Sequence, residues 1–288
     1  MSANSAETAR RSAAGLHRAV TLLGELTLRG AAALRNGVEI LGGVALLMGD
    51  VLRRSASAFF SRKSKLNRTA LIDQMVRVGV RGIPIVMLVQ IFIGIILALQ
   101  MAPVLQQYGQ LDRVADIIGI AIFRELGPLI SAILLSGFAG ASIAAELGAM
   151  VEGEEIKAMR AFALDPIRFL VAPRVWATVV MLTALTIIAD VIGVFGGWLT
   201  STMVLNVDSH NYINATRAAL THRDFLTGLV KAGVFGALIS LIACYQGLNV
   251  TGGAEGVGRA TTATVVKSIV ALIATDCVFT AVFYALGW

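Results

Sequence analysis

The sequence contains few charged residues, and this scarcity excludes an ordinary soluble protein. Asp, Glu, Lys and Arg make up 15% of its 288 residues, whereas apolar residues make up 57%. A soluble domain of this length needs far more charge to cover its surface. The surplus apolar surface therefore has to face lipid, and we predict an integral membrane protein.

Residues that build disulfides, metal sites and nucleotide sites are also scarce. The two cysteines, Cys244 and Cys277, lie inside apolar stretches and are expected to be packing residues. The three histidines, His17, His210 and His222, lack the spacing of metal ligands. No G-x-x-x-x-G-K-S/T motif occurs, so no phosphate-binding loop is predicted. Since no nucleophile–base pair stands out either, we expect neither an enzyme nor a metal or cofactor site.

The N-terminal part lacks the features of a signal peptide and of a nucleic-acid-binding region. No apolar segment of the signal-peptide type precedes about residue 40, and residues 1–15 are expected to be disordered. Eleven of the 24 Lys and Arg residues fall within residues 1–68, and no aromatic residues are interleaved with them. This distribution is typical of a cytoplasmic, lipid-adjacent segment and not of a nucleic-acid groove.

Five stretches are long and apolar enough to cross a membrane as helices, which takes about 20 residues each. The first is a run of 30 residues without charge, and the second is interrupted by Arg124-Glu125 and by Gly127-Pro128. The expected spans cover about residues 81–112, 115–145, 175–205, 225–248 and 265–286. We therefore predict an all-α membrane domain over residues 69–288.

Basic residues predict which side of the membrane each loop faces, because cytoplasmic loops are rich in Lys and Arg. Six of them lie directly before the first span, between Arg62 and Arg81, and four lie between the second and third spans. The opposite side holds only Arg113, Arg217 and Arg223. We therefore expect the N-terminus in the cytoplasm and the C-terminus on the outer face.

Residues 16–60 differ from the spans, since apolar positions recur at steps of three and four residues with charges between them. This pattern is typical of an amphipathic helix that lies in the membrane interface. We therefore assign residues 16–68 to an interfacial region. The alternative is a sixth span over residues 38–48, but eleven residues are too few to cross a bilayer.

A short helix is expected between the second and third spans, at about residues 152–166. Its first turn is acidic, with Glu154 and Glu155 placed where the helix dipole favours negative charge. Asp165-Pro166 is expected to end it, because proline cannot continue the hydrogen-bond ladder.

One face of this short helix carries an apolar stripe, and basic residues lie elsewhere on it. The stripe consists of Ile156, Met159 and Phe162/Ala163, and the basic residues are Lys157 and Arg160. Such a stripe either packs back onto the membrane domain or docks into the groove of a cytoplasmic partner and acts as a lever. Periodicity alone does not separate these two interpretations.

Two glycine patterns indicate local structure. Gly193-x-x-x-Gly197 in the third span would permit close packing of helices. The run GGAEGVG (Gly252–Gly258) is expected to form a flexible turn between the fourth and fifth spans.

Four motifs, in order along the chain, resemble those of the MlaE/YrbE family. They are RELGP (Arg124–Pro128), GFAGASIAAELGAM (Gly137–Met150), EEIKAMRAFALDPIRFLVAPRVWA (Glu154–Ala177) and GVGRATTATVVKS (Gly256–Ser268). The similarity covers roughly residues 60–288, with matching spacings between the motifs. Members of this family are permease subunits of lipid-transporting ABC systems that work with MCE-domain proteins.

The resemblance implies a homodimeric permease in a bacterial inner membrane, with phospholipid or a similar lipid as its substrate. Each protomer would have an N-terminal interfacial helix and five spans. Two copies of a separate ATPase, which binds the ATP, would grip Glu154–Pro166 as a coupling helix. An MCE-domain ring on the outer face would continue the lipid path.

The resemblance also implies where the substrate lies. The family places lipid between the two protomers, beside the first span, the loop after it and the acid of RELGP. The run FIGIILALQ (Phe92–Gln100) in the first span matches the family closely. The matching substrate positions are Leu97, Val104, Leu105, Tyr108 and Glu125.

Four ionisable residues fall within or at the edge of the spans: Glu125, Asp190, Lys231 and Asp276. Such groups cost several kcal/mol in a membrane unless they are paired or hydrated. We expect Lys231 to pair with an acid, preferentially Asp276, and to hold the fourth and fifth spans together. Glu125 would instead line the central cavity. The alternative is that all of them form structural ion pairs without a part in transport.

Two other functions remain open at the level of the sequence. A proton-coupled secondary transporter would use Glu125, Lys231 and Asp276 as a relay. Five spans without an internal repeat argue against it, because many such carriers are built from repeats. A membrane scaffold without a cavity is the third interpretation.

Overall fold

A computed structural model describes residues 35, 37–55 and 68–287 of the chain. It divides into two units, Met1–Met48 and Gly49–Trp288, which we describe separately. The described residues are mostly helical and include no strand, in agreement with the predicted all-α class. The predictions for residues 1–34 and 56–67, among them the disordered tail, lie outside the described residues.

The described part of the N-terminal unit is helical. Residues 37–55 form one helix, which continues beyond the boundary of the unit at Met48. Val38, Leu41 and Leu46 are among its exposed apolar side chains, at 68%, 70% and 76%. The interfacial position of this helix stays a prediction.

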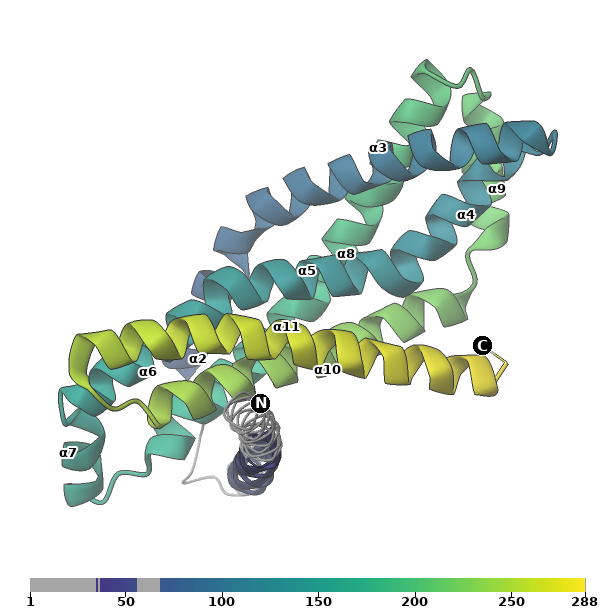
Figure 1. Cartoon of the computed structure of the whole chain (residues 1–288). Helices are drawn as coiled ribbons and strands as arrows, with labels where there is room; N and C mark the ends of the chain where they lie inside the picture. The colour runs from purple at the N-terminus through teal and green to yellow at the C-terminus, as the bar shows by residue number, and fades with distance from the viewer. Residues whose placement is uncertain (1–34, 36, 56–67, 288) are drawn as a thin grey trace, which may run out of the picture. The chain divides into compact units, whose positions relative to one another are not determined.

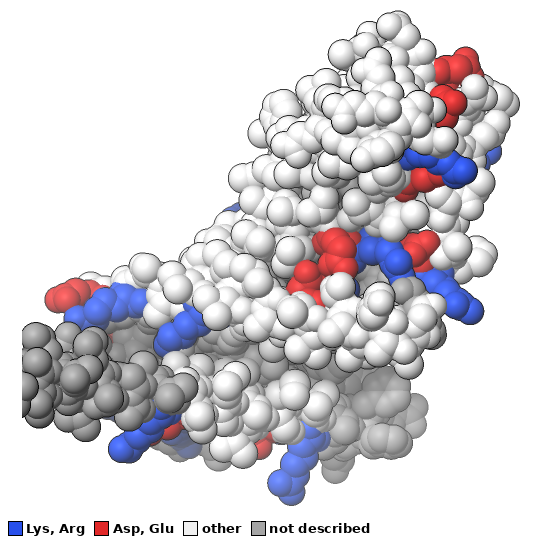
Figure 2. Space-filling view, turned by 45° about the vertical axis from the view of Figure 1, so that its right-hand side comes forward, with Lys and Arg blue, Asp and Glu red and all other residues white. Residues whose placement is uncertain are grey.

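Five helical segments are long and apolar enough to cross a membrane, and they confirm the predicted number. They are Thr69–Gln107, Leu111–Glu152, Ile167–Met203, His222–Leu248 and Gly253–Ala285. Most of the face in Figure 2 is free of charged side chains, and several of those present gather in patches that contain both signs. The protein is therefore a multi-pass membrane protein.

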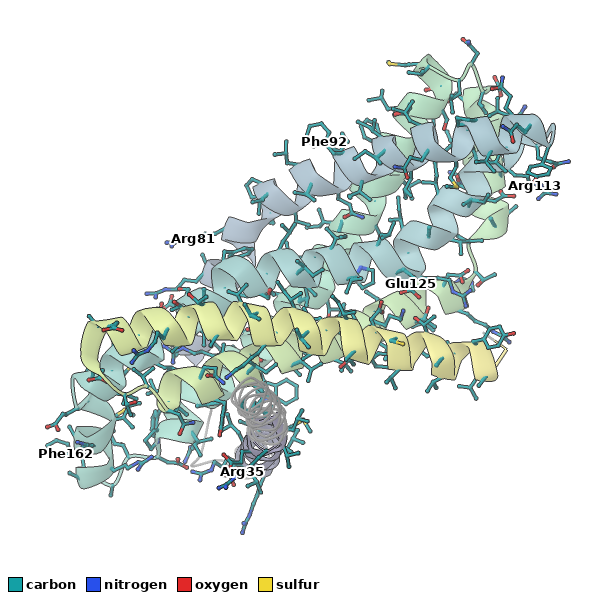
Figure 3. The ribbon with its side chains drawn as sticks, in the orientation of Figure 1. Arg35, Arg81, Phe92, Arg113, Glu125 and Phe162 are labelled. Carbon is teal, nitrogen blue, oxygen red and sulfur yellow. The ribbon has the colours of Figure 1, made fainter. Side chains whose placement is uncertain are left out.

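The spans alternate in direction, which gives the second unit two ends (Figure 1). In the first span, α2 (Arg68–Val78) and the short turn η1 (Val80–Gly82) lead into α3 (Ile83–Gln107). One end of the unit carries α7 (Glu155–Ala161), between the second and third spans, and we name it the α7 end. The opposite end carries α9 (Ser209–Ala219), between the third and fourth spans, and we name it the α9 end. Figure 3 shows Arg81 and Arg113 at opposite ends of α3, with Phe92 between them.

The second span is one continuous helical path with two wide turns. After the short turn η2 (Leu111–Arg113) it runs through α4 (Val114–Ala121), α5 (Gly127–Leu135) and α6 (Ala141–Glu152). The π-helical turns η3 (Ile122–Leu126) and η4 (Ser136–Gly140) join these three helices. The predicted interruption at Arg124-Glu125 is thus a π turn, in which the N–H of Gly127 donates to the carbonyl of Ile122. Such turns keep the helix continuous beside a proline and often occur at functional positions.

The remaining spans are α8, α10 and α11. The π turn η5 (Ile167–Val171) leads into α8 (Ala172–Met203), and α10 covers His222–Leu248. The fifth span is α11 (Gly253–Ala285), which begins twelve residues before the predicted start at residue 265. The prediction of a turn over Gly252–Gly258 was therefore wrong. Within this run only Gly252 and Gly253 have the positive φ of a turn, and the residues after them are helical.

Glycines allow α3 and α8 to pack closely along their length. A Cβ added at Gly94 would overlap the carbonyl oxygen of Gly193 and lie 2.8 Å from the backbone nitrogen of Gly197. One added at Gly196 would overlap the carbonyl oxygen of Ile91. The prediction of close packing at Gly193-x-x-x-Gly197 is therefore confirmed. In lipid such close contacts supply much of the attraction between helices. The hydrophobic effect contributes little there, because lipid tails are as apolar as the helix surfaces.

The two cysteines differ in their environment. Cys244 in α10 is fully buried, as expected of a packing residue, whereas Cys277 in α11 is exposed. The packing interpretation was therefore wrong for Cys277, since its side of α11 faces away from the other described helices.

Replacing Gly94 with alanine should separate α3 from α8. We expect Gly94→Ala to lower the stability by about 1–3 kcal/mol, because the backbone of α8 has to move. The matched control is Gly258→Ala on α11, where an added Cβ meets nothing within 4 Å. Melting temperatures in detergent measure both variants, and equal values for them would contradict this view of the crossing.

Candidate functional site

A buried lysine binds two carboxylates where three spans meet. Lys231 of α10 is 1% exposed, and its Nζ lies 2.6 Å from Oε2 of Glu125 in η3. The same Nζ lies 2.9 Å from Oδ1 of Asp276 in α11. The predicted pair of Lys231 with Asp276 is therefore present. Glu125 belongs to the same cluster, although it was expected from the sequence to line a cavity instead of pairing with Lys231.

Thr280 completes this cluster and was missed by the sequence analysis. Its Oγ1 accepts a hydrogen bond from Lys231 Nζ at 3.2 Å and donates one to Oε1 of Glu125 at 3.0 Å. Thr280 follows Asp276 by four residues on α11, so both side chains lie on one helix face. That spacing is the signal in the sequence that could have found it. We call Glu125, Lys231, Asp276 and Thr280 the charged cluster.

Glu125 is the more open of the two carboxylates in the charged cluster. Its side chain is 36% exposed, against 14% for Asp276. A cavity of about 250 Å³ lies beside Glu125, which Figure 3 labels on the second span. Residues of the second, fourth and fifth spans line this cavity: Ile120, Ala121, Arg124, Glu125, Thr227, Lys231, Thr280, Phe283 and Tyr284.

The neighbouring residue of the π turn makes a second ion pair to α10. Arg124 Nε lies 3.1 Å from Oδ1 of Asp224. Oδ2 of Asp224 accepts hydrogen bonds from the backbone N–H and the hydroxyl of Thr221, at 2.8 and 2.6 Å, as the capping box of α10. Adjacent residues of η3 are thus attached to two positions of α10, which anchors the wide turn firmly.

Asp190 lies apart from the charged cluster, in the core of the bundle. It is 2% exposed in α8 and packs directly against Gly127, where any Cβ would overlap its Oδ1. Among the described residues, Oδ1 has no hydrogen-bond partner. Gly127 therefore has to be glycine to leave room for this carboxyl group.

The four apolar positions that the resemblance assigned to substrate do not gather around Glu125. Leu97 and Leu105 pack against the buried cluster that includes Ile118 and Tyr212. Val104 and Tyr108 are 49% and 76% exposed near the end of α3. None of the four lines the cavity beside Glu125. Of the four, therefore, only Val104 and Tyr108 are exposed within one chain.

The segment between the second and third spans contains the expected short helix with different limits. The helix α7 covers Glu155–Ala161 and follows Glu154, which has the positive φ of 59°. It ends at Ala161, before Ala163 with φ 56°. The prediction that Asp165-Pro166 ends this helix was therefore wrong. These residues begin the next helix, because Oδ1 of Asp165 accepts from the N–H of Ile167 at 3.1 Å.

The apolar stripe of α7 is divided between the protein and its surroundings. Ile156 is 6% exposed and Met159 is partly buried, so this part packs onto the membrane domain. Phe162 is 79% exposed and projects from the α7 end (Figure 3). The packing interpretation is therefore confirmed for Ile156, whereas docking of the exposed part into a partner stays a prediction.

Charged residues surround α7. Glu154 and Lys157 form an exposed pair at 2.8 Å, which lowers the pKa of the Glu154 carboxyl and raises that of the Lys157 ammonium. Arg160 is exposed on the same helix. Asp165 forms an ion pair with Arg54, and Ser55 accepts a hydrogen bond from Trp176 Nε1 at 2.9 Å. The segment is therefore tied to residues before the first span.

A second cluster of charged residues near the α7 end was missed by the sequence analysis. The arginines there had been used only to predict which side of the membrane each loop faces. Glu146 of α6 receives Nη1 of Arg77 at 2.8 Å and Nη2 of Arg174 at 3.0 Å, one on each carboxylate oxygen. Arg174 is almost fully buried and also donates to the carbonyl of Leu170 at 3.0 Å. Glu146 thereby joins α2, α6 and α8 beside the α7 segment.

Comparison with known families decides the relationship of this chain. The model of the family described as "Permease MlaE" matches residues 71–282, which include the charged cluster, Glu146 and α7. The chain belongs to the MlaE permease family. Residues 1–70, with the N-terminal unit, lie outside the match.

Curated MlaE relatives cover most of the chain. A probable ABC transporter permease protein of Rickettsia felis is 38% identical over 214 residues, 74% of this chain and 83% of that protein. The intermembrane phospholipid transport system permease protein MlaE of Haemophilus influenzae is 33% identical over 218 residues, 75% of this chain and 84% of that protein. The chloroplastic protein TRIGALACTOSYLDIACYLGLYCEROL 1 of Arabidopsis thaliana is 32% identical over 222 residues, 77% of this chain and 63% of that protein.

Removing the lysine of the charged cluster should destabilise the protein more than neutralising Glu125. Lys231→Met leaves two facing carboxylates without a counter-charge, and loss of one partner of a buried pair costs about 3–5 kcal/mol. Glu125→Gln keeps an oxygen and an amide for hydrogen bonds at a partly exposed position, so its loss should be smaller. Thermal unfolding in detergent measures both variants. A Lys231→Met variant as stable as the wild type would show that the three charges are not paired.

Proposed function

We propose that this chain is the membrane-spanning subunit of an ABC transporter that moves phospholipid or a similar lipid between membranes. The match to the MlaE permease family over residues 71–282 carries the proposal. The names of the relatives from Rickettsia felis and Haemophilus influenzae, an ABC transporter permease and a phospholipid transport permease, support it. The chain itself would perform no chemistry, and ATP would be bound by a separate ATPase subunit.

The proposed coupling site for that ATPase is the α7 segment. Phe162 is 79% exposed, and aromatic side chains of this kind anchor a helix in a partner's groove. Exposed charges at Glu154, Glu155, Lys157 and Arg160 surround the helix and suit the polar rim of an interface. Met159, Asp165 and Pro166, which the resemblance also assigns to coupling, would hold the segment in position from its buried side.

Movement of α7 would pass directly into the spans. The segment links α6 to α8 along the chain, and Ile156 packs it onto the membrane domain. The Glu146 cluster joins both of these helices to α2 just beyond it. Closure of the ATPase would thus tilt the second and third spans together. For this to drive transport, the ATPase has to bind two states of the permease with different affinity.

The proposed lipid path runs beside Glu125. Its carboxylate is the more exposed of the two in the charged cluster and adjoins the cavity of about 250 Å³. Lys231, Asp276 and Thr280 would set its position, whereas Asp190 would serve the packing around Gly127. In a homodimer, Val104 and Tyr108 at the end of α3 would face the second protomer, with Leu97 and Leu105 supporting them from behind.

The assembly that we propose follows the resemblance to the MlaE family. Two copies of this chain form the permease, and an MCE-domain protein binds at the α9 end and continues the path. The α7 end would face the cytoplasm together with the N-terminus, since the loops there hold more basic residues. The membrane would then be a bacterial inner membrane. An organelle envelope is the less favoured location, in view of the chloroplastic relative.

Neutralising the proposed lipid-facing acid should impair transport without preventing insertion. We expect Glu125→Gln to lower ATP-driven lipid transfer in reconstituted vesicles by about tenfold, because one buried polar contact is worth about 1.4 kcal/mol. Membrane insertion, monodispersity and binding of the ATPase serve as controls and should stay unchanged. Transfer at the wild-type rate would remove Glu125 from the site.

Changing the exposed aromatic residue of α7 should weaken attachment of the ATPase. Phe162→Asp places a charge where we expect an apolar anchor, and the affinity should fall by about tenfold or more, as for an aromatic hot spot. The matched control is Leu286→Asp, an exposed apolar residue at the opposite end of the protein. Co-purification of the ATPase with each variant measures the effect. Equal recovery with both variants would place the coupling site elsewhere.

The alternative function, a proton-coupled carrier, makes the opposite prediction about the energy source. The charged cluster holds titratable groups of three spans in contact, which is the feature that such a carrier would use. Lipid transfer by the assembled transporter should stop when ATP is removed and should persist when the proton gradient is collapsed. Transfer that follows the proton gradient without ATP would favour the carrier.

A further inference from the structure

An apolar pocket lies between the third span and α9, away from the charged cluster. Its volume is about 440 Å³, within the range of sites that hold small molecules. It shares no lining residue with the cavity beside Glu125. The lining comes from the second half of α8 and from α9: Val191, Val194, Phe195, Trp198, Tyr212, Ile213, Thr216 and Arg217.

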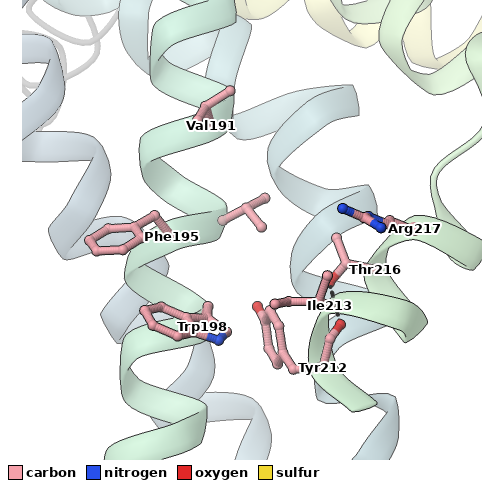
Figure 4. A pocket seen from close by; sticks show the side chains of 8 residues that line it. Val191, Phe195, Trp198, Tyr212, Ile213, Thr216 and Arg217 are labelled. Carbon is pink, nitrogen blue, oxygen red and sulfur yellow. Dashed lines mark hydrogen bonds between the residues drawn. The ribbon is translucent and has the colours of Figure 1, made fainter. Parts of the chain in front are cut away.

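The position and the lining of this pocket match the tail of a lipid. Val191, Phe195 and Trp198 come from successive turns of α8, and Tyr212, Ile213 and Arg217 come from α9 (Figure 4). The rings of Phe195 and Trp198 are 5.4 Å apart, near the end of the span where aromatic residues favour the membrane interface. Since α8 is one of the spans, an acyl chain of the surrounding lipid is the natural occupant of an apolar pocket beside it.

Arg217 is the charged residue among those that line the pocket. No hydrogen bond or ion pair joins its guanidinium to any residue that the structure describes. It occupies the last turn of α9, which lies outside the five spans. A guanidinium presents paired N–H donors that fit the oxygens of a phosphate. The charge therefore complements an anionic headgroup.

A buried hydroxyl group gives a second, independent indication of a ligand. Tyr212 is 2% exposed, and its hydroxyl has no hydrogen-bond partner among the described residues. Figure 4 shows its oxygen directed from α9 towards α8, where it lies beside Gly197. Buried hydroxyl groups in proteins are usually paired, so this one has a free donor for an ester oxygen of a bound lipid.

We propose that the pocket between α8 and α9 binds one acyl chain of an anionic lipid, whose phosphate is held by Arg217. The contact of Trp198 Nε1 with Ser209 Oγ, at 3.1 Å, fixes α9 against α8 and keeps the pocket open. The N-cap of α9 adds to this, since Asp208 accepts from the N–H of Asn211 at 3.0 Å. The site is thus largely preformed, and it stands independently of the proposed function.

Quenching of Trp198 fluorescence by brominated lipids tests the proposal on the full chain. Trp176→Phe and Trp288→Phe leave Trp198 as the single tryptophan. The protein is reconstituted into phosphatidylcholine bilayers that contain small fractions of brominated phosphatidylglycerol or of brominated phosphatidylcholine. We expect half-maximal quenching at a roughly fivefold lower fraction of the anionic lipid, as one arginine near a membrane surface provides.

Two variants and a matched control decide between the pocket and bulk lipid. Arg217→Gln should remove the difference between the two lipids, whereas Arg81→Gln at the α7 end should leave it unchanged. Val194→Phe fills the pocket without adding a tryptophan and should raise the fraction needed for both lipids. Size-exclusion profiles establish that each variant is folded.

Two results would overturn the proposal. Quenching that is equal for both lipids and insensitive to Arg217→Gln would mean that Trp198 contacts only bulk lipid. The same measurement is repeated on the assembled transporter. Loss of quenching in that complex would mean that a helix of a partner protein, and not a lipid, occupies the pocket.

Discussion

Lipid offers no hydrogen bonds, so an ionisable group within the spans needs a partner inside the protein to stay charged. Lys231 meets this requirement with Glu125, Asp276 and Thr280, which come from two other spans. The cluster holds the second, fourth and fifth spans at fixed positions, since separating any of them would leave a charge unpaired in an apolar medium. The same contacts leave Glu125 at a cavity, so one arrangement stabilises the bundle and presents an acid to a ligand.

The same constraint shapes the backbone. Helices that gain little from the hydrophobic effect have to pack closely, and Gly94 with Gly193 and Gly196 permits this along α3 and α8. Gly127 serves another purpose, because its missing side chain leaves room for the carboxyl group of Asp190. The π turn beside it keeps the second span continuous and directs Arg124 and Glu125 to two positions on α10. Regular packing and the candidate site therefore depend on the same few residues.

The sequence predicted features that follow from local composition and periodicity. The five spans, the short helix near residue 156 and the contact at Gly193-x-x-x-Gly197 all belong to this group. Its errors concern positions where local signals conflict. Gly252–Gly258 contains enough glycine for a turn, yet Glu255 pairs with Arg259 one helical turn later and the helix begins at Gly253. Pro166 was interpreted as an end, whereas proline is equally suited to the first turn of the following helix.

By itself, the sequence determined the class, the number of spans, the family and the presence of four ionisable residues among apolar ones, because these depend only on which residues occur and in what order. Only the tertiary structure decided which of those residues meet. Glu125 joins Lys231 from 106 residues away, and Glu146 collects Arg77 and Arg174 from two other helices. Such contacts depend on the rotation and the crossing of whole helices, and helices with little amphipathic pattern leave that rotation undefined until they pack together.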